Sequence, residues 1–204
     1  MELVGKIEKV FQPSDVSPRP ELRGKSVLLR GPLPQDKADR ARWGRHPEIL
    51  RLYGVDAASI DTAELPPEAI ETWFAEVARD PLRWVVEAGG RCIGQARLHS
   101  LDEHNRRARF GIGLFAPELL DRGFGTEATR LVLWHAFETL RLHRIDLRVL
   151  ASNTRAIRCY EKCGFVREGI ERDSVLIDGE WNDDLIMSIL EDEYRRFVHI
   201  WGYR

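Results

Sequence analysis

Two short segments of the sequence carry the residue types best suited to chemistry. The first reads Leu120-Asp121-Arg122-Gly123-Phe124-Gly125-Thr126 and runs into a long apolar stretch. This pattern predicts a glycine-rich turn at the start of a helix. The first N–H groups of a helix have no carbonyl partner and lie at the positive end of its dipole, so they favour a phosphate. The segment therefore predicts a pyrophosphate cradle.

The second segment runs from Asn153 to Phe165 and predicts a helix capped by Asn153 and ended by Gly164. Asn153, Ala156 and Tyr160 have the spacing i, i+3, i+7, so they share one helix face. A phenol, with a pKa of about 10, can return a proton to a thiolate whose conjugate thiol has a pKa of about 8.5. The two segments together indicate a phosphate site beside a proton donor.

The strand expected just before the first segment, over residues 106–115, has two different faces. One face is apolar, whereas the other carries Arg107, Arg109, Gly111 and Gly113. Two glycines on one face indicate a bulge or the close approach of another backbone or a ligand. A ligand with amide groups can pair with such a strand edge as a peptide does.

The remaining pattern predicts an α/β (α+β) fold, a three-layer α/β/α sandwich around a mixed, mostly antiparallel sheet. Periodicity and turn residues predict which segments are helical and which are extended. Residues 44–64 are expected to be irregular. Strands are expected over residues 27–30, 83–87, 91–101, 106–115, 144–151, 166–177 and 180–190, and helices over 34–43, 67–79, 125–140 and 153–163.

Composition excludes several classes of protein. The 204 residues carry a net charge of −2, which gives no electrostatic reason to expect nucleic acid as a partner. No apolar run approaches the roughly 20 residues that span a bilayer, and residues 1–20 lack the apolar core of a signal peptide. The three cysteines lack the spacing of a disulfide framework or a metal site, so we expect reduced thiols, no metal and a cytoplasmic location.

The two motifs resemble those of the GCN5-related N-acetyltransferase (GNAT) superfamily, especially its branch of ribosomal-protein N-terminal and polyamine acetyltransferases. The family loop, Gln/Arg-x-x-Gly-x-Gly/Ala followed by Thr-Glu-Ala, is similar to residues 120–128. The family motif Asn-x-x-Ala…Tyr-Glu-Lys-x-Gly-Phe is matched from Asn153 to Phe165. The resemblance implies an acetyltransferase domain over residues 22–190. An extended arm over 1–21 and a helical tail over 191–204, packed on the domain or on a second subunit of a homodimer, would flank it.

The resemblance also implies roles for individual residues. Acetyl-CoA would be the co-substrate of a direct transfer to a primary amine, with Tyr160 as the proton donor and Asn153 near the acetyl group. Arg155, Arg158 and Lys162 are candidates for the adenosine 3′-phosphate, although a solvated basic face explains them equally well. The implied CoA contacts are Gly113, Leu114, Phe115, Arg122, Gly123, Phe124, Gly125, Thr126, Asn153 and Arg158.

Arg109 and Leu120 depart from the family pattern. Family members often carry glutamate at the position of Arg109, and an arginine cannot accept a proton near neutral pH. The base would then be bulk water, a group such as Glu87, Asp102, Glu103 or His104, or none if the amine is already neutral. Leu120 replaces a polar residue but leaves the backbone donors of the loop in place.

Two questions stay open at this stage. The acceptor is a protein N-terminus, a polyamine, an aminoglycoside or another amine. The alternative function, motivated by Arg109, is a CoA-binding regulatory or sensor protein that keeps the fold without turnover.

Overall fold

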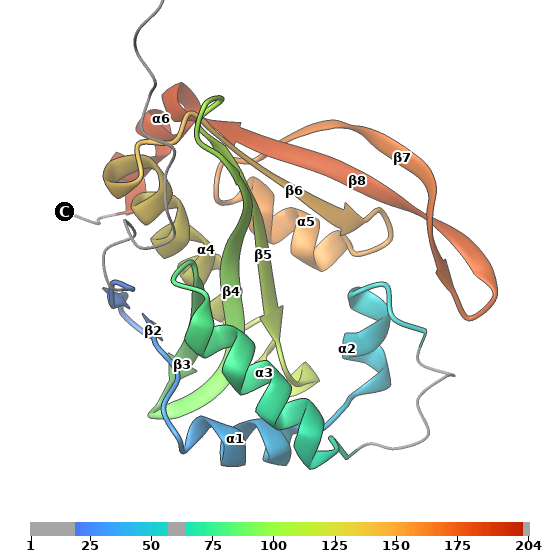
Figure 1. The fold of residues 1–204 in the computed structure, drawn as a ribbon. Helices are drawn as coiled ribbons and strands as arrows, with labels where there is room; N and C mark the ends of the chain where they lie inside the picture. The colour runs from blue at the N-terminus through green and yellow to red at the C-terminus, as the bar shows by residue number, and fades with distance from the viewer. Residues whose placement is uncertain (1–18, 57–63, 202–204) are drawn as a thin grey trace, which may run out of the picture.

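The protein, described by a computed structural model over residues 19–56 and 64–201, forms one sheet covered by helices on both faces (Figure 1). The strand order is β1-β2-β3-β4-β5-β6-β8-β7, and all pairs are antiparallel except β5 with β6. This mixed sheet between helical layers confirms the predicted fold class.

The strands lie close to the predicted segments, except β1, which was not predicted. They are β1 (Leu22–Arg23), β2 (Leu28–Arg30), β3 (Arg83–Ala88), β4 (Arg91–Asp102), β5 (Arg107–Leu114), β6 (Arg144–Leu150), β7 (Val166–Ile177) and β8 (Glu180–Leu190). The helices are α1 (Asp36–Trp43), α2 (Pro47–Leu52), α3 (Pro67–Arg79), α4 (Phe124–Trp134), α5 (Thr154–Glu161) and α6 (Glu191–Trp201). The Asp178-Gly179 hairpin between β7 and β8 is confirmed, with both residues at positive φ, as the tight turn requires.

The two faces of β3 to β5 bury different partners because side chains alternate along a strand. Trp84 and Val86 face α4, whereas Val85 packs with Trp73 and Val77 of α3. Helix α3 has the apolar stripe that its spacing predicts, and it ends at Asp80 before Pro81. The sheet therefore has one face toward α3 and one toward α4.

Helix α4 is the central helix of the domain. Among its residues Ala128, Thr129, Leu131, Val132 and Leu133 are buried, and none is exposed. The chain continues as a π-helical turn over His135–Thr139. The predicted long, buried helix is thus confirmed, although its last turn is wider than α-helical geometry.

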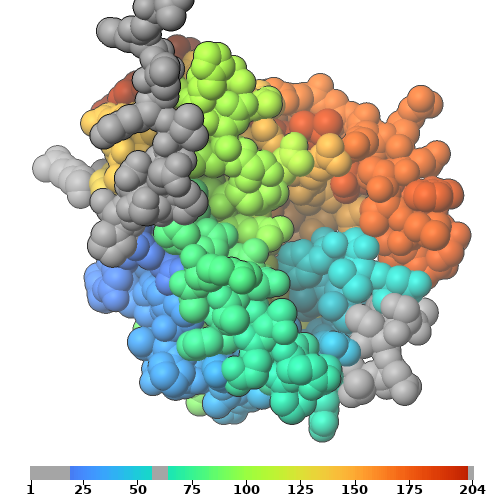
Figure 2. Space-filling view, in the orientation of Figure 1, coloured from blue at the N-terminus to red at the C-terminus, as the bar shows by residue number. Residues whose placement is uncertain are grey.

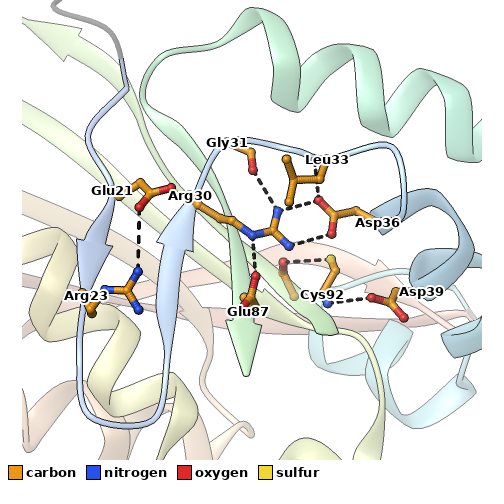
Figure 3. Close-up of polar contacts among 10 residues, drawn as sticks. Glu21, Arg23, Arg30, Gly31, Leu33, Asp36, Asp39, Glu87 and Cys92 are labelled. Carbon is orange, nitrogen blue, oxygen red and sulfur yellow. Dashed lines mark hydrogen bonds and ion pairs between the residues drawn. The ribbon is translucent and has the colours of Figure 1, made fainter. Parts of the chain in front are cut away.

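A buried ion pair fixes the start of α1 against the sheet (Figure 3). Both side chains, Arg30 and Asp36, are almost fully buried, and the guanidinium donates to the two carboxylate oxygens over 2.7 and 2.8 Å. Glu87 also accepts from Arg30 at 2.5 Å. One helical turn on, Asp39 accepts from the backbone N–H of Cys92 at 2.9 Å. These bonds hold α1 beside β2 and β4.

The prediction that residues 44–64 are irregular is wrong for Pro47–Leu52, which forms α2. Tertiary contacts support this six-residue helix. Arg51 pairs with Asp178 in the β7–β8 turn at 2.8 Å, and Glu48 pairs with Arg155 of α5 at 3.2 Å. Figure 2 shows α2 in cyan between the green α3 and the orange hairpin. Residues 57–63 of the same predicted segment lie outside the described residues.

Helix α6 follows β8 directly and packs on the helical turn after α4. The ring of Tyr194 stacks on Phe137 with centroids 4.6 Å apart, and Trp201 contacts Tyr194. The predicted N-terminal arm lies outside the described residues up to position 18, as does the end of the tail over 202–204. Among the helices described, none is long and apolar enough to cross a membrane.

Candidate active site

Strands β5 and β6 separate part-way along their length. They pair at only three register positions, of which the last joins Arg109 and Asp146. Beyond that point both strands continue, and the groups of β5 that would face β6 have no strand partner. A cavity of about 1020 Å³ opens here, lined by Gly111 to Phe115 on one side and Arg148 to Leu150 on the other.

The first turn of α4 forms one end of this cavity. Gly123 precedes the helix with φ +84°, a conformation that favours glycine. Its carbonyl accepts from the N–H of Glu127, which closes the first helical turn. The N–H groups of Phe124, Gly125 and Thr126 belong to that turn and have no carbonyl partner within the helix. These donors suit an anionic ligand.

Helix α5 places an amide and a phenol on the same cavity. The Asn153 side chain caps the helix by accepting from the N–H of Ala156 at 3.1 Å. The Tyr160 ring is 8% exposed and lies edge-on to Phe110 and Phe165. Its hydroxyl makes no hydrogen bond within the described part of the chain. Burial, together with the nearby Cys159 and Tyr53, raises the pKa of Tyr160, so the phenol is protonated at neutral pH.

The cavity collects all of the implied catalytic and CoA-contact residues except one. Arg122 does not line it, and its guanidinium instead lies 5.1 Å from the centre of the Phe124 ring. The candidates that do line it are Gly113, Leu114, Phe115, Gly123, Phe124, Gly125, Thr126, Asn153, Arg158 and Tyr160.

Comparison with known proteins assigns this arrangement to a family. The model of the acetyltransferase (GNAT) domain matches residues 26–166, more than half of the chain. The chain belongs to the GNAT acetyltransferase family. It is 37% identical over 113 residues to the spermidine N(1)-acetyltransferase of Vibrio cholerae, covering 55% of this chain and 65% of that protein, less than two thirds of its length.

Two further comparisons extend over most of the fold. The uncharacterized N-acetyltransferase YoaA of Bacillus subtilis is 28% identical over 176 residues, covering 84% of this chain and 97% of that protein. A crystal structure of the Vibrio cholerae spermidine N-acetyltransferase with CoA and spermine has a TM-score of 0.68 and 27% identity. That comparison covers 83% of this chain and 98% of the neighbour.

Arg109 departs from the usual GNAT glutamate, but it does not line the cavity. Its Nε donates to Asp146 at 2.7 Å. None of the four side chains suggested as bases lines the cavity either. Glu87 is bonded to Arg30, and Asp102 accepts from Asn105. Glu103 and His104 are absent from the cavity lining.

Tyr53 and Asp184 are among the cavity residues that the sequence did not reveal. The hydroxyl of Tyr53 donates to the Leu114 carbonyl at 3.4 Å, and a Cβ added at Gly113 would lie 2.8 Å from that hydroxyl. Asp184 is half-buried, and burial raises its pKa. Asp184 belongs to β8 and pairs with Leu150 of β6, so it lies across the gap from β5. In the sequence, the one hint for Tyr53 is the glycine that follows it, because Gly54 is a residue type that commonly ends a helix.

Two cysteines contact Thr126 in the first turn of α4, and of these Cys159 lines the cavity. The Thr126 hydroxyl and the Cys159 thiol are 3.2 Å apart, and the Cys163 thiol donates to the Thr126 carbonyl at 3.5 Å. Hydrogen bonds from Cys163 and Thr126 hold the pKa of Cys159 at about 7. Both cysteines are reduced. Within the described residues no cluster of metal-ligating side chains is present.

Proposed function

We propose that this protein transfers the acetyl group of acetyl-CoA directly to a primary amine. The observation that carries the proposal is the single cavity that joins the donor-rich start of α4, the unpaired edge of β5 and the Tyr160 phenol. These parts match, in order, a pyrophosphate, a pantetheine chain with two amides and a thiolate leaving group.

The proposed CoA site is built mainly from the backbone. The N–H groups of Phe124, Gly125 and Thr126 bind the pyrophosphate, and the backbone of Gly113 to Phe115 pairs with pantetheine. Substitution of the loop's first residue by Leu120 does not remove these donors. Arg158 and Lys162 line the same cavity and are exposed, so they supply positive charge for the outer phosphates.

In the proposed reaction the amine nitrogen attacks the thioester carbonyl, and the C–S bond then breaks as the amide forms. Tyr160 gives its proton to the departing sulfur. Its raised pKa keeps the phenol protonated at neutral pH, and the tyrosinate that forms regains a proton from the positively charged nitrogen as the amide forms. Most of the rate enhancement comes from holding the two substrates together.

The attacking amine must be neutral, and two features of the cavity favour this state. Arg40 places positive charge on the lining, which lowers the pKa of a nearby amine. Asp184, whose pKa is raised by burial, is better suited to accept a proton than an exposed carboxylate is. Because Arg109 lies outside the cavity lining, its inability to act as a base does not argue against turnover.

The test is mass-spectrometric detection of acetylated product with acetyl-CoA and a panel of polyamines, aminoglycosides, amino acids and short peptides. A mass readout avoids interference from the protein's own thiols. Catalytic acetylation of any of these amines supports the proposal. Acetyl-CoA binding without turnover of any amine would favour the CoA-binding regulatory protein, and absence of acetyl-CoA binding would contradict both functions.

A further inference from the structure

Arg97 is a half-buried arginine on the floor of the cavity without an acidic partner. It lies on β4 opposite Gly111 of β5, and a Cβ added at Gly111 would meet its Nε at 3.5 Å. Within the described part of the chain its guanidinium makes no ion pair or side-chain hydrogen bond. Burial and the neighbouring Arg83 lower its pKa, and the carboxylates of Asp80 and Glu76, which pair with Arg83, offset this only in part.

The neighbouring arginines differ from Arg97 because each already has a carboxylate. Arg83, opposite Arg97 on β3, pairs with Glu76 at 2.6 Å. Arg148, across the gap on β6, pairs with Glu171 at 2.7 Å. A partly desolvated charge without a partner is unfavourable unless a ligand compensates it. Of these three arginines, Arg97 is therefore the one that would bind an anionic ligand most favourably.

Arg97 faces the acceptor side of the cavity, away from the expected phosphates. Its side chain lies on the face of the sheet that packs on α3, as does Val85, whereas the start of α4 belongs to the opposite layer. Gly111, opposite Arg97, lies two residues from Gly113, which corresponds to about 7 Å along the strand. The anion site is thus separated by two residues of β5 from Gly113, where the proposed pantetheine segment begins.

We propose that Arg97 binds an anionic group of the acceptor, so that the preferred substrate is an amine carrying a carboxylate several bonds from its nitrogen, and not a polycation. The inference rests on the proposed acetyl transfer and specifies its acceptor. Asp184 lines the same cavity from the other side of the gap and would meet the amine end, while Arg97 would bind the opposite end. The acceptor is either a free amino acid-like molecule or a peptide N-terminus followed by an acidic residue.

Matched acceptors test the charge preference directly. Linear aminopentanoate, aminopentanol and diaminopentane present the same amine with an anionic, neutral or cationic far end. The expected kcat/KM for the anionic compound exceeds the other two by about tenfold or more, as for a charge-assisted hydrogen bond. Short peptides beginning Ser-Glu, Ser-Gln and Ser-Lys repeat the comparison and distinguish a peptide from a small-molecule acceptor.

The variant Arg97→Gln should remove the preference, and Arg97→Lys should restore part of it. The affinity for acetyl-CoA should be unchanged in both variants. Arg91→Gln is the matched control, because Arg91 lies on the same strand but is exposed and outside the cavity lining. A wild-type preference for diaminopentane, or a preference for the anion that survives Arg97→Gln, would overturn the inference.

A binding measurement separates this inference from the proposed function. Calorimetry of N-acetylated aminopentanoate with the CoA-saturated protein should give measurable binding in the wild type and a loss of about tenfold in Arg97→Gln. If no amine is acetylated but this difference is found, the transfer proposal fails and the anion site stands. If acetylation proceeds without this difference, the transfer proposal stands and the anion site fails.

Discussion

The Nε of Arg109 donates to Oδ1 of Asp146 over 2.7 Å at the last register position where β5 and β6 pair. The Asp146 side chain is only 14% exposed. The ion pair therefore closes the parallel ladder at the point from which the two strands separate. An arginine at this position joins the strands, whereas a glutamate would face another carboxylate.

Arg109→Gln is expected to lower the free energy of unfolding by about 1 kcal/mol, because it leaves Asp146 with only the more distant Arg144. The affinity for acetyl-CoA should change little. Arg107→Gln is the control, since Arg107 forms an exposed pair with Asp102 and its loss should cost less than about 0.5 kcal/mol. Urea unfolding and calorimetry give both quantities. Loss of activity with unchanged stability would instead assign Arg109 a part in the reaction.

Tyr160→Phe should lower the rate of acetyl transfer by about 100-fold, the scale of one general acid. The ring contacts with Phe110 and Phe165 remain, and the hydroxyl has no bond to lose among the described residues. The free energy of unfolding and the affinity for acetyl-CoA should therefore be almost unchanged. Steady-state kinetics and calorimetry on the same preparation check this, and an unchanged rate would remove Tyr160 from the mechanism.

Gly123→Ala is expected to weaken acetyl-CoA binding by distorting the turn before α4. Its φ of +84° strains any other residue, although a Cβ would meet no atom within 4 Å. Gly179→Ala is a close control, because Gly179 has φ +83° and equal space in the β7–β8 turn. Both variants should lose about 1 kcal/mol of stability. Equal acetyl-CoA affinity of the two variants would show that the Gly123 turn does not hold the ligand.

Cys159 should react with iodoacetamide near neutral pH, because its pKa is about 7 and its thiol lines the cavity. The buried Cys92, whose pKa is raised to about 12, should stay unmodified. Saturating CoA should slow the reaction of Cys159, since the proposed pyrophosphate site lies directly above this thiol. Peptide mapping after timed alkylation measures the three effects. Equal rates with and without CoA would place the ligand elsewhere.

His135 should make stability depend on pH. Burial lowers its pKa from 6.5 to about 4, and its Nδ1 has no hydrogen-bond partner. At a pH between about 4 and 6.5, His135 binds a proton in the unfolded state but not in the folded state. The free energy of unfolding is therefore highest above pH 6.5 and falls as the pH decreases below it. The loss approaches on the order of 3 kcal/mol near pH 4. His135→Met should reduce this dependence, and identical pH profiles for both proteins would contradict it.

The sequence predicts well those parts of the fold that are stabilised by interactions between residues close together in the chain. The Asp178-Gly179 hairpin and the Asn153 cap follow from turn and capping chemistry within a few residues. Helix α2 was missed because its six residues depend on ion pairs with distant segments, including Arg51 with Asp178. Short helices have little stability of their own.

The site shows the same limit. The glycines before α4 and Tyr160 could be recognised from the spacing of residues within their two motifs, and the fold brings both motifs to one cavity. The sequence could not show that Arg97 lacks an ion pair. This depends on the ion pairs that its neighbours Arg83 on β3 and Arg148 on β6 form with other carboxylates. The sequence also could not show that Glu87, one of the suggested bases, is bound to Arg30.

The most direct measurement is a crystal structure of the protein with CoA. We expect pyrophosphate oxygens at about 3 Å from the N–H groups of Phe124, Gly125 and Thr126. Pantetheine should lie between β5 and β6, with its sulfur within hydrogen-bonding reach of the Tyr160 hydroxyl. A CoA molecule bound outside this cavity, or one whose sulfur lies far from Tyr160, would contradict the proposed function.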